Sequence, residues 1–107
     1  MDKIRNLNSI QVFNEVSRLK SITLSAKSLH ISQSSVSYHI KKLEDELNAA
    51  LFQRNREGLT LTSNGETLAT HVANGLRSIQ IGLEKASDQT EIVRIAILPL
   101  FASRWLS

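Results

Sequence analysis

Residues 32–47 read SQSSVSYHIKKLEDEL, and the apolar side chains of this stretch recur with the period of an α-helix. Steps of four, three and four residues separate them, which places Val36, Ile40, Leu43 and Leu47 on one face. The opposite side carries hydroxyl, aromatic and ammonium groups, which can bind phosphates and the edges of bases. These groups belong to Ser34, Ser37, Tyr38 and Lys41. The stretch therefore predicts a helix that packs through one face and contacts a polyanion through the other.

Two helices are predicted before this stretch. The first is expected over about residues 8–20 and the second over about residues 22–29, with Ser21 or Thr23 as the N-cap of the second. Only two residues separate the second helix from Ser32, which is itself a suitable N-cap for the third. Two helices joined by so short a turn form a helix-turn-helix, whose second member can lie in a major groove.

The segments after residue 47 predict a small β wing. Residues 51–54 and 59–61 alternate apolar and polar side chains, and residues 55–58, Asn-Arg-Glu-Gly, tolerate the tight turn of a hairpin. Arg54 and Arg56 lie near the tip of this hairpin. From there they would contact backbone phosphates or a minor groove.

A long helix is expected from Thr62 to about Ser87. Ser63 and Glu66 are spaced for a capping box, with Thr62 as the alternative cap. Apolar residues in alternating steps of three and four predict a seam for a second copy of the chain. Folding of this helix back onto its own domain is the alternative. The seam residues are Ala69, Val72, Leu76, Ile79, Leu83 and Ala86.

The last stretch, residues 92–107, begins with a nearly continuous apolar, β-prone run, which is typical of a strand buried on both faces. Nothing else in the chain can cover both faces, so we expect it to begin a further domain. The predicted fold is mainly α: a winged helix-turn-helix of three helices and a two-stranded wing, a long dimerisation helix and an orphan β strand. The expected domains are residues 1–62, 63–90 and 91–107.

Composition excludes several classes of protein. The chain has 107 residues and no cysteine, which removes disulfides, thiolate metal sites and cysteine nucleophiles. Its start, MDKIRNLNSI, lacks the apolar segment of a secretion signal, and no apolar run is long enough to span a bilayer. We therefore expect a cytoplasmic protein with no membrane partner and no cofactor in this chain.

Positive charge is concentrated in the first half of the chain. Residues 18–43 contain no acidic residue, whereas acidic residues outnumber basic ones over residues 61–91. This distribution is typical of a nucleic-acid-binding surface, and a solvated charged surface is the alternative. The basic residues of the first segment are Arg18, Lys20, Lys27, Lys41 and Lys42.

Catalysis and metal binding are not predicted. His30, His39 and His71 have no metal-ligand spacing, and each is expected to be structural or on the surface. Ser37, His39 and Asp45 share one helix at angles unsuited to a hydrolase triad. We therefore expect a binding protein rather than an enzyme.

Roles in DNA binding follow from position. The N-terminal half of a recognition helix usually enters the groove, so its polar residues are expected to contact base edges. These residues are Gln33, Ser34, Ser37 and Tyr38. Gln33 suits adenine, with a backbone cap as its alternative role. Hydroxyls and cations near the ends of helices and strands suit phosphates. For Lys42, the alternative is a solvated surface lysine that makes no contact with DNA. This second group contains Thr23, Ser32, Lys41, Lys42, Arg54 and Arg56.

These motifs resemble the LysR-type transcriptional regulators over nearly the whole chain. Ser21-Ile22-Thr23, Leu29-His30-Ile31-Ser32-Gln33 and Val36-Ser37 resemble the helix-turn-helix signature of that family. Leu51-Phe52, Gly58-Leu59 and Leu61-Thr62 through Gly65 resemble its wing and the entry to its linker helix. The tail, with Leu98-Pro99 and residues 101–106, is similar to the start of the effector-binding domain in the glycine-cleavage-activator subgroup.

The resemblance implies a bacterial, dimeric regulator of transcription that binds double-stranded DNA. Its linker helices would pair antiparallel, and a small-molecule effector would bind a C-terminal domain that this chain lacks beyond its first strand. Many members carry Pro-Ala where this chain has Ser34-Ser35, and an arginine where it has Tyr38 or Leu24. Because arginine can bind guanine bidentately, the base preference of such members does not transfer to this chain. The alternative function is a truncated interaction module that forms mixed dimers with a full-length regulator.

Overall fold

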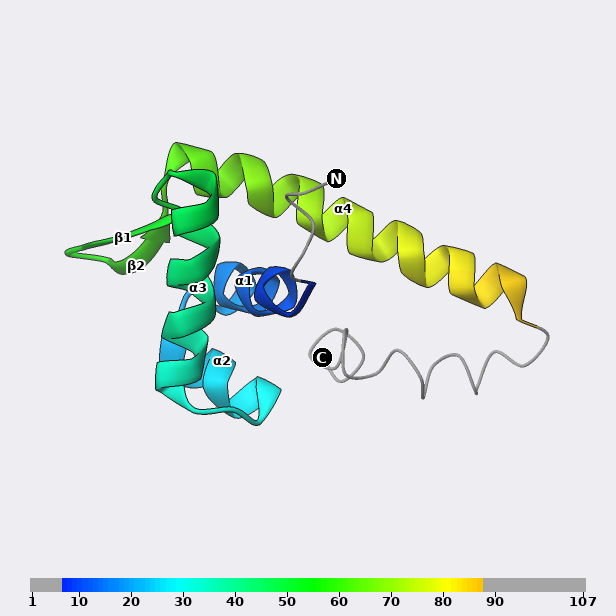
Figure 1. Cartoon of the computed structure of the whole chain (residues 1–107), viewed down its shortest axis with the longest axis horizontal. Helices are drawn as coiled ribbons and strands as arrows, with labels where there is room; N and C mark the ends of the chain where they lie inside the picture. The colour runs from blue at the N-terminus through cyan, green and yellow to red at the C-terminus, as the bar shows by residue number, and fades with distance from the viewer. Residues whose placement is uncertain (1–6, 88–107) are drawn as a thin grey trace. The chain divides into compact units, whose positions relative to one another are not determined.

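The computed structural model describes residues 7–87, and these form a winged helix-turn-helix followed by a longer helix (Figure 1). The bounds of the elements are α1 Leu7–Leu19, α2 Ile22–Leu29, α3 Gln33–Leu47, β1 Phe52–Asn55, β2 Gly58–Leu61 and α4 Ser63–Ala86. The chain divides into two compact units after Val72. The fold predicted for this part is therefore confirmed, while the strand expected in residues 92–107 lies outside the described residues.

The turn between α2 and α3 is fixed by local hydrogen bonds. Ser21 caps α2 by accepting from the Leu24 amide at 3.0 Å, and Ser32 caps α3 by accepting from the Ser35 amide at 3.0 Å. α2 ends at Leu29, and its C-cap His30 takes the left-handed conformation with φ 59°. The Ile31 amide then donates to the Ala26 carbonyl at 3.1 Å. The turn is thus stabilised at both ends, which fixes where α3 begins.

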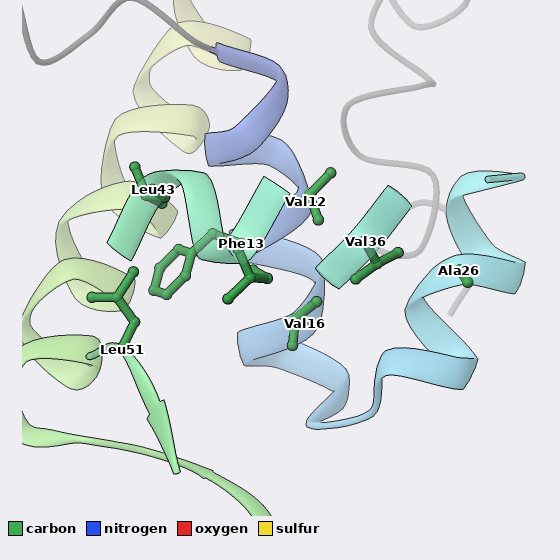
Figure 2. Close-up of a cluster of buried hydrophobic side chains, with 8 residues drawn as sticks. Val12, Phe13, Val16, Ala26, Val36, Leu43 and Leu51 are labelled. Carbon is green, nitrogen blue, oxygen red and sulfur yellow. The ribbon is translucent and has the colours of Figure 1, made fainter. Parts of the chain in front are cut away.

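The core lies where α1, α2 and α3 meet the start of the wing (Figure 2). Phe13 and Val16 of α1 and Val36 of α3 are fully buried, and Leu51, just before β1, is 1% exposed. The Phe13 ring packs against the Phe52 ring with a centroid distance of 5.5 Å. α3 therefore packs through its predicted apolar face, which leaves its other face for solvent.

The wing is a hairpin with a two-residue turn. Asn55 pairs with Gly58 across the antiparallel strands, so only Arg56 and Glu57 form the turn. Gly58 has φ 103°, a conformation that side chains disfavour, and the Asn55 side chain accepts from the Glu57 amide at 2.9 Å. β1 therefore begins and ends one residue later than predicted, and β2 begins one residue earlier than predicted.

A carboxylate on α3 holds the start of the wing. One oxygen of Glu44, Oε2, accepts from the Leu51 amide at 2.7 Å and from the Phe52 amide at 3.4 Å. Hydrogen bonds to a charged acceptor are stronger than neutral ones. This bond occupies the Leu51 amide, which explains why the strand begins at Phe52 rather than at Leu51.

The start of α4 corrects one prediction. Thr62, not Ser63, is the cap: its hydroxyl accepts from the Gly65 amide at 3.0 Å and donates to the Ala50 carbonyl at 2.6 Å. The Thr62 amide also bonds to the Leu51 carbonyl at 3.0 Å. Because these bonds hold Thr62 at the end of the wing, Ser63 is already helical, and the Ser63–Glu66 capping box was wrong.

The predicted seam of α4 differs in exposure along its length. Ala69 and Val72 are half-buried and pack against the core of the first unit, as the alternative of folding back requires. Leu76 is 6% exposed, whereas Ile79 is 51% exposed and Leu83 42% exposed, and Ala86 is exposed as well. The free apolar surface of the seam is therefore confined to its second half.

Among residues 7–87, no helix has both the length and the apolar character needed to cross a membrane.

Candidate nucleic-acid interface

The polar face of α3 is open to solvent along its first two turns. Gln33, Ser34 and Ser37 are exposed, and Tyr38 is 61% exposed. The side-chain amide of Gln33 makes no hydrogen bond to another described residue. Gln33 therefore does not serve as a backbone cap, which was its alternative role. These four side chains are therefore available to an external partner.

A groove of about 470 Å³ runs along this face and is called the first groove below. Thr23 of α2 lines it together with Gln33, Ser34 and Ser37 of α3 and Arg54 of the wing. The first groove therefore brings together residues from three separate parts of the sequence. Hydroxyl, amide and guanidinium groups in one concave surface can bind a polyanion.

A second groove of about 370 Å³ lies between α3 and the wing. It shares Ser37 and Arg54 with the first groove, so the two grooves adjoin. Lys41 lines this second groove, and its ammonium lies 3.7 Å from Asp45 with both side chains well exposed. An exposed pair of this kind contributes about 0–1 kcal/mol, so Lys41 can exchange Asp45 for a phosphate at small cost.

Tyr38 lies beside α3 neighbours rather than in either groove. The Lys42 ammonium is 6.0 Å from the centroid of the Tyr38 ring, and the His39 ring meets Tyr38 edge-on at 5.5 Å. His39 in turn is hydrogen bonded through Nδ1 to the Ser9 hydroxyl of α1 at 2.9 Å. Lys42, which is half-buried, therefore has a cation–π contact with Tyr38 within the chain.

The remaining predicted phosphate ligands lie at the ends of elements. Ser32 caps α3, and its hydroxyl lies 3.1 Å from the Ser34 hydroxyl, with either oxygen able to donate. Arg56 is exposed in the two-residue turn of the wing and lines neither groove. Arg54 and Arg56 therefore occupy different surfaces, one inside the grooves and one at the hairpin tip.

Lys20 is a groove residue that sequence reasoning did not assign. It follows α1 directly and lines the first groove with Arg54 and Gln33. The available signal was its place in the segment that contains no acidic residue. The sequence put it at the end of the first helix and did not show which way that end would face.

The three histidines line neither groove. Within residues 7–87, no group of three or more His, Asp or Glu side chains could hold a metal ion. His30 closes α2, His39 is bonded to Ser9, and His71 is exposed on α4.

Comparison with known proteins assigns most of the chain to a family. Residues 7–66 match the family described as "Bacterial regulatory helix-turn-helix protein, lysR family". The chain belongs to this family. The LysR assignment agrees with the resemblance seen in the sequence, and the family and its curated relatives are transcriptional regulators rather than enzymes.

Two relatives from Escherichia coli K12 illustrate the similarity. The HTH-type transcriptional regulator PerR is 37% identical to this LysR-family chain over 101 residues, covering 94% of this chain and 34% of PerR. The glycine cleavage system transcriptional activator is 32% identical over 102 residues, covering 94% of this chain and 33% of that protein. The chain thus spans about a third of the length of the curated relatives it matches.

Solved structures show the same fold. The complex of the BenM DBD with catB site 1 DNA has a TM-score of 0.71 and 25% identity, covering 76% of this chain and 91% of that one. A probable transcriptional regulator from Pseudomonas aeruginosa has a TM-score of 0.69 and 33% identity, covering 77% of this chain and 28% of that one. The described residues therefore have the winged helix of LysR regulators.

Proposed function

We propose that this LysR-family chain binds double-stranded DNA sequence-specifically as a homodimer and regulates transcription in the bacterial cytoplasm. α3 would enter the major groove, and the wing would contact the backbone or the minor groove. The observation that carries the proposal is the first groove, where the exposed polar face of α3 adjoins Thr23 and Arg54. The similarity to a DNA complex of a family member supports it.

The proposed contacts divide into two groups. Gln33, Ser34, Ser37 and Tyr38 would contact base edges, because they are the exposed side chains of the first two turns of α3. Hydroxyls and cations around them would bind phosphates and fix the position of α3 on the duplex. This second group consists of Thr23, Ser32, Lys41, Lys42, Arg54 and Arg56.

Dimerisation is proposed through α4. The seam consists of Ala69, Val72, Leu76, Ile79, Leu83 and Ala86, and the members exposed in a single chain are the last three. Burying Ile79 and Leu83 against a second copy would remove apolar surface from water, at about 25 cal/mol per Å². Higher homo-oligomers would use the same helix.

The domain boundaries remain part of the proposal. Residues 1–62 would form the DNA-binding domain and residues 63–90 the linker helix. Residues 91–107 would form the first strand of an effector-binding domain, whose small-molecule ligand would bind outside this chain. The relatives are about three times as long as this chain, which leaves room in such a protein for a further domain.

The test is selection of duplexes from random sequence, followed by fluorescence anisotropy over a range of salt concentrations. A homodimer should select an inverted repeat with half-sites about 34 Å apart, or a multiple of that spacing, and its affinity should fall steeply with salt. Arg54→Gln should weaken binding to every sequence, whereas Gln33→Ala should cost about 1–3 kcal/mol at one base position. Absence of both salt dependence and sequence preference would refute DNA recognition.

A second candidate function is favoured by the exposed half of the α4 seam. In this second function, the chain would act as an interaction module that forms mixed dimers with a full-length regulator. Ile79 and Leu83 would make the contact. Size-exclusion chromatography with and without a full-length relative separates the two functions. Exclusive heterodimers without DNA affinity would favour this candidate over the first.

A further inference from the structure

The backbone of Lys20 has an unusual conformation that directs the chain from α1 into α2. Its φ is 52°, in the left-handed region that few residues other than glycine and asparagine adopt readily. Its amide bonds to the Val16 carbonyl at 2.7 Å, which closes α1. Lys20 is therefore held at a defined point beside the N-terminus of α2, although its side chain is exposed.

The charge of Lys20 is not neutralised within the described chain. Arg18, two residues earlier, pairs with Glu15 at 3.3 Å, whereas Lys20 has no acidic partner among residues 7–87. The described residues that line the first groove with Lys20 include no Asp or Glu, and Arg54 is the other cation. Two cations that line one groove without an acidic residue give it a positive potential, which favours the binding of an anion.

The geometry points to Lys20 as a phosphate-binding residue of the DNA interface. We propose that Lys20, from the end of α1, and Arg54, from the wing, bind the phosphodiester backbone of the duplex that α3 enters. This inference rests on the proposed DNA binding and adds a residue to it. Because Lys20 would contact the backbone rather than bases, it would set affinity and salt dependence without changing the preferred sequence.

Three variants of the 107-residue chain test this role. Lys20→Asn removes the charge and keeps the left-handed backbone, because asparagine tolerates that conformation. Lys20→Arg keeps the charge. Lys27→Gln is the matched control, since Lys27 is also an exposed lysine of this acid-free segment but does not line the first groove.

The measurement is the slope of log affinity against log salt for the duplex selected by the wild type. Each phosphate contact contributes about 0.9 to this slope. Because a homodimer carries two copies of Lys20, Lys20→Asn should lower the slope by about 1.8. Over a fourfold rise in salt, the wild type should therefore lose about 12-fold more affinity than Lys20→Asn. Lys20→Arg and Lys27→Gln should keep the wild-type slope, and all variants should select the same sequence. Circular dichroism melts establish that each variant is folded.

The outcomes separate this inference from the function on which it rests. If the wild type binds no duplex, the proposed function is wrong. If the wild type binds and folded Lys20→Asn keeps the full slope, or loses no more of it than Lys27→Gln, the assignment of Lys20 is wrong. A changed sequence preference in Lys20→Asn would also overturn it, because a backbone ligand does not select bases.

Discussion

Gly65 in the first turn of α4 gives the sharpest prediction for stability. A Cβ atom at this position would lie 2.0 Å from the Leu51 carbonyl oxygen and 2.9 Å from Cδ2 of Leu61. The Leu51 oxygen belongs to the backbone and accepts from the Thr62 amide, so it cannot turn away as a side-chain end would. Gly65→Ala therefore forces α4 and the wing apart by about 1 Å or more.

The expected cost follows from the interactions at this junction. Separation weakens the bond between Thr62 and Leu51, worth about 1 kcal/mol, and the Thr62 cap on the Gly65 amide, worth about 1 kcal/mol. Displacement of Leu51 from the core adds about 1–3 kcal/mol. The better helix propensity of alanine returns about 1 kcal/mol. The net loss in the free energy of unfolding is about 2–4 kcal/mol.

Thermal unfolding followed by far-UV circular dichroism measures this loss. For a domain of this size each 1 kcal/mol corresponds to about 4–8 °C, so Tm should fall by about 8–32 °C. Gly75→Ala is the matched control in the same helix, because nothing lies within 4 Å of an added Cβ there. The control should raise stability by up to about 1 kcal/mol. A Gly65→Ala variant as stable as the wild type would refute the steric argument.

Three further predictions concern other single sites. Ser25 is fully buried, and its hydroxyl has no hydrogen-bond partner within the described residues. Ser25→Ala should therefore raise the free energy of unfolding by about 0.5–2 kcal/mol. A variant less stable than the wild type in urea unfolding would contradict this. Glu44→Ala should lower the free energy of unfolding by about 1.5–3 kcal/mol and weaken DNA binding, because the start of the wing loses its hydrogen bonds. Glu44→Gln keeps an acceptor oxygen and should lose less stability. Equal losses in the two variants would show that these hydrogen bonds do not stabilise the wing. Replacing Ile79 and Leu83 together by glutamate should give monomers in analytical ultracentrifugation with an unchanged melt of the first unit, and persistence of dimers would exclude this half of α4 as the seam.

The sequence predicted the elements whose determinants are local. Ser32 caps the helix that follows it, and the apolar face of α3 could be counted from the spacing of its residues, because a helix repeats every 3.6 residues. The boundaries that were wrong depend on distant partners. The choice of Thr62 over Ser63 follows from the Ala50 and Leu51 carbonyls, and the start of β1 follows from Glu44.

The candidate site was predictable to the same extent. Gln33, Ser34 and Ser37 could be placed on one side of a helix from their spacing alone. Their position beside Arg54 depends on the packing of the wing, and the contribution of Lys20 depends on a single left-handed residue between two helices. That backbone angle has no signal in residue type, since lysine is rarely found at positive φ.

The division of α3 into a buried and an open face has a consequence for the evolution of this regulator. Val36, Ile40 and Leu43 hold the fold, while the four side chains proposed to contact bases are exposed and carry none of the core. Surface substitutions of this kind usually change stability by no more than about 0.5 kcal/mol. Under the proposed base contacts, mutation at these positions can change the preferred operator with little risk of unfolding. A library that varies only these four positions should then yield many folded proteins with altered target sites.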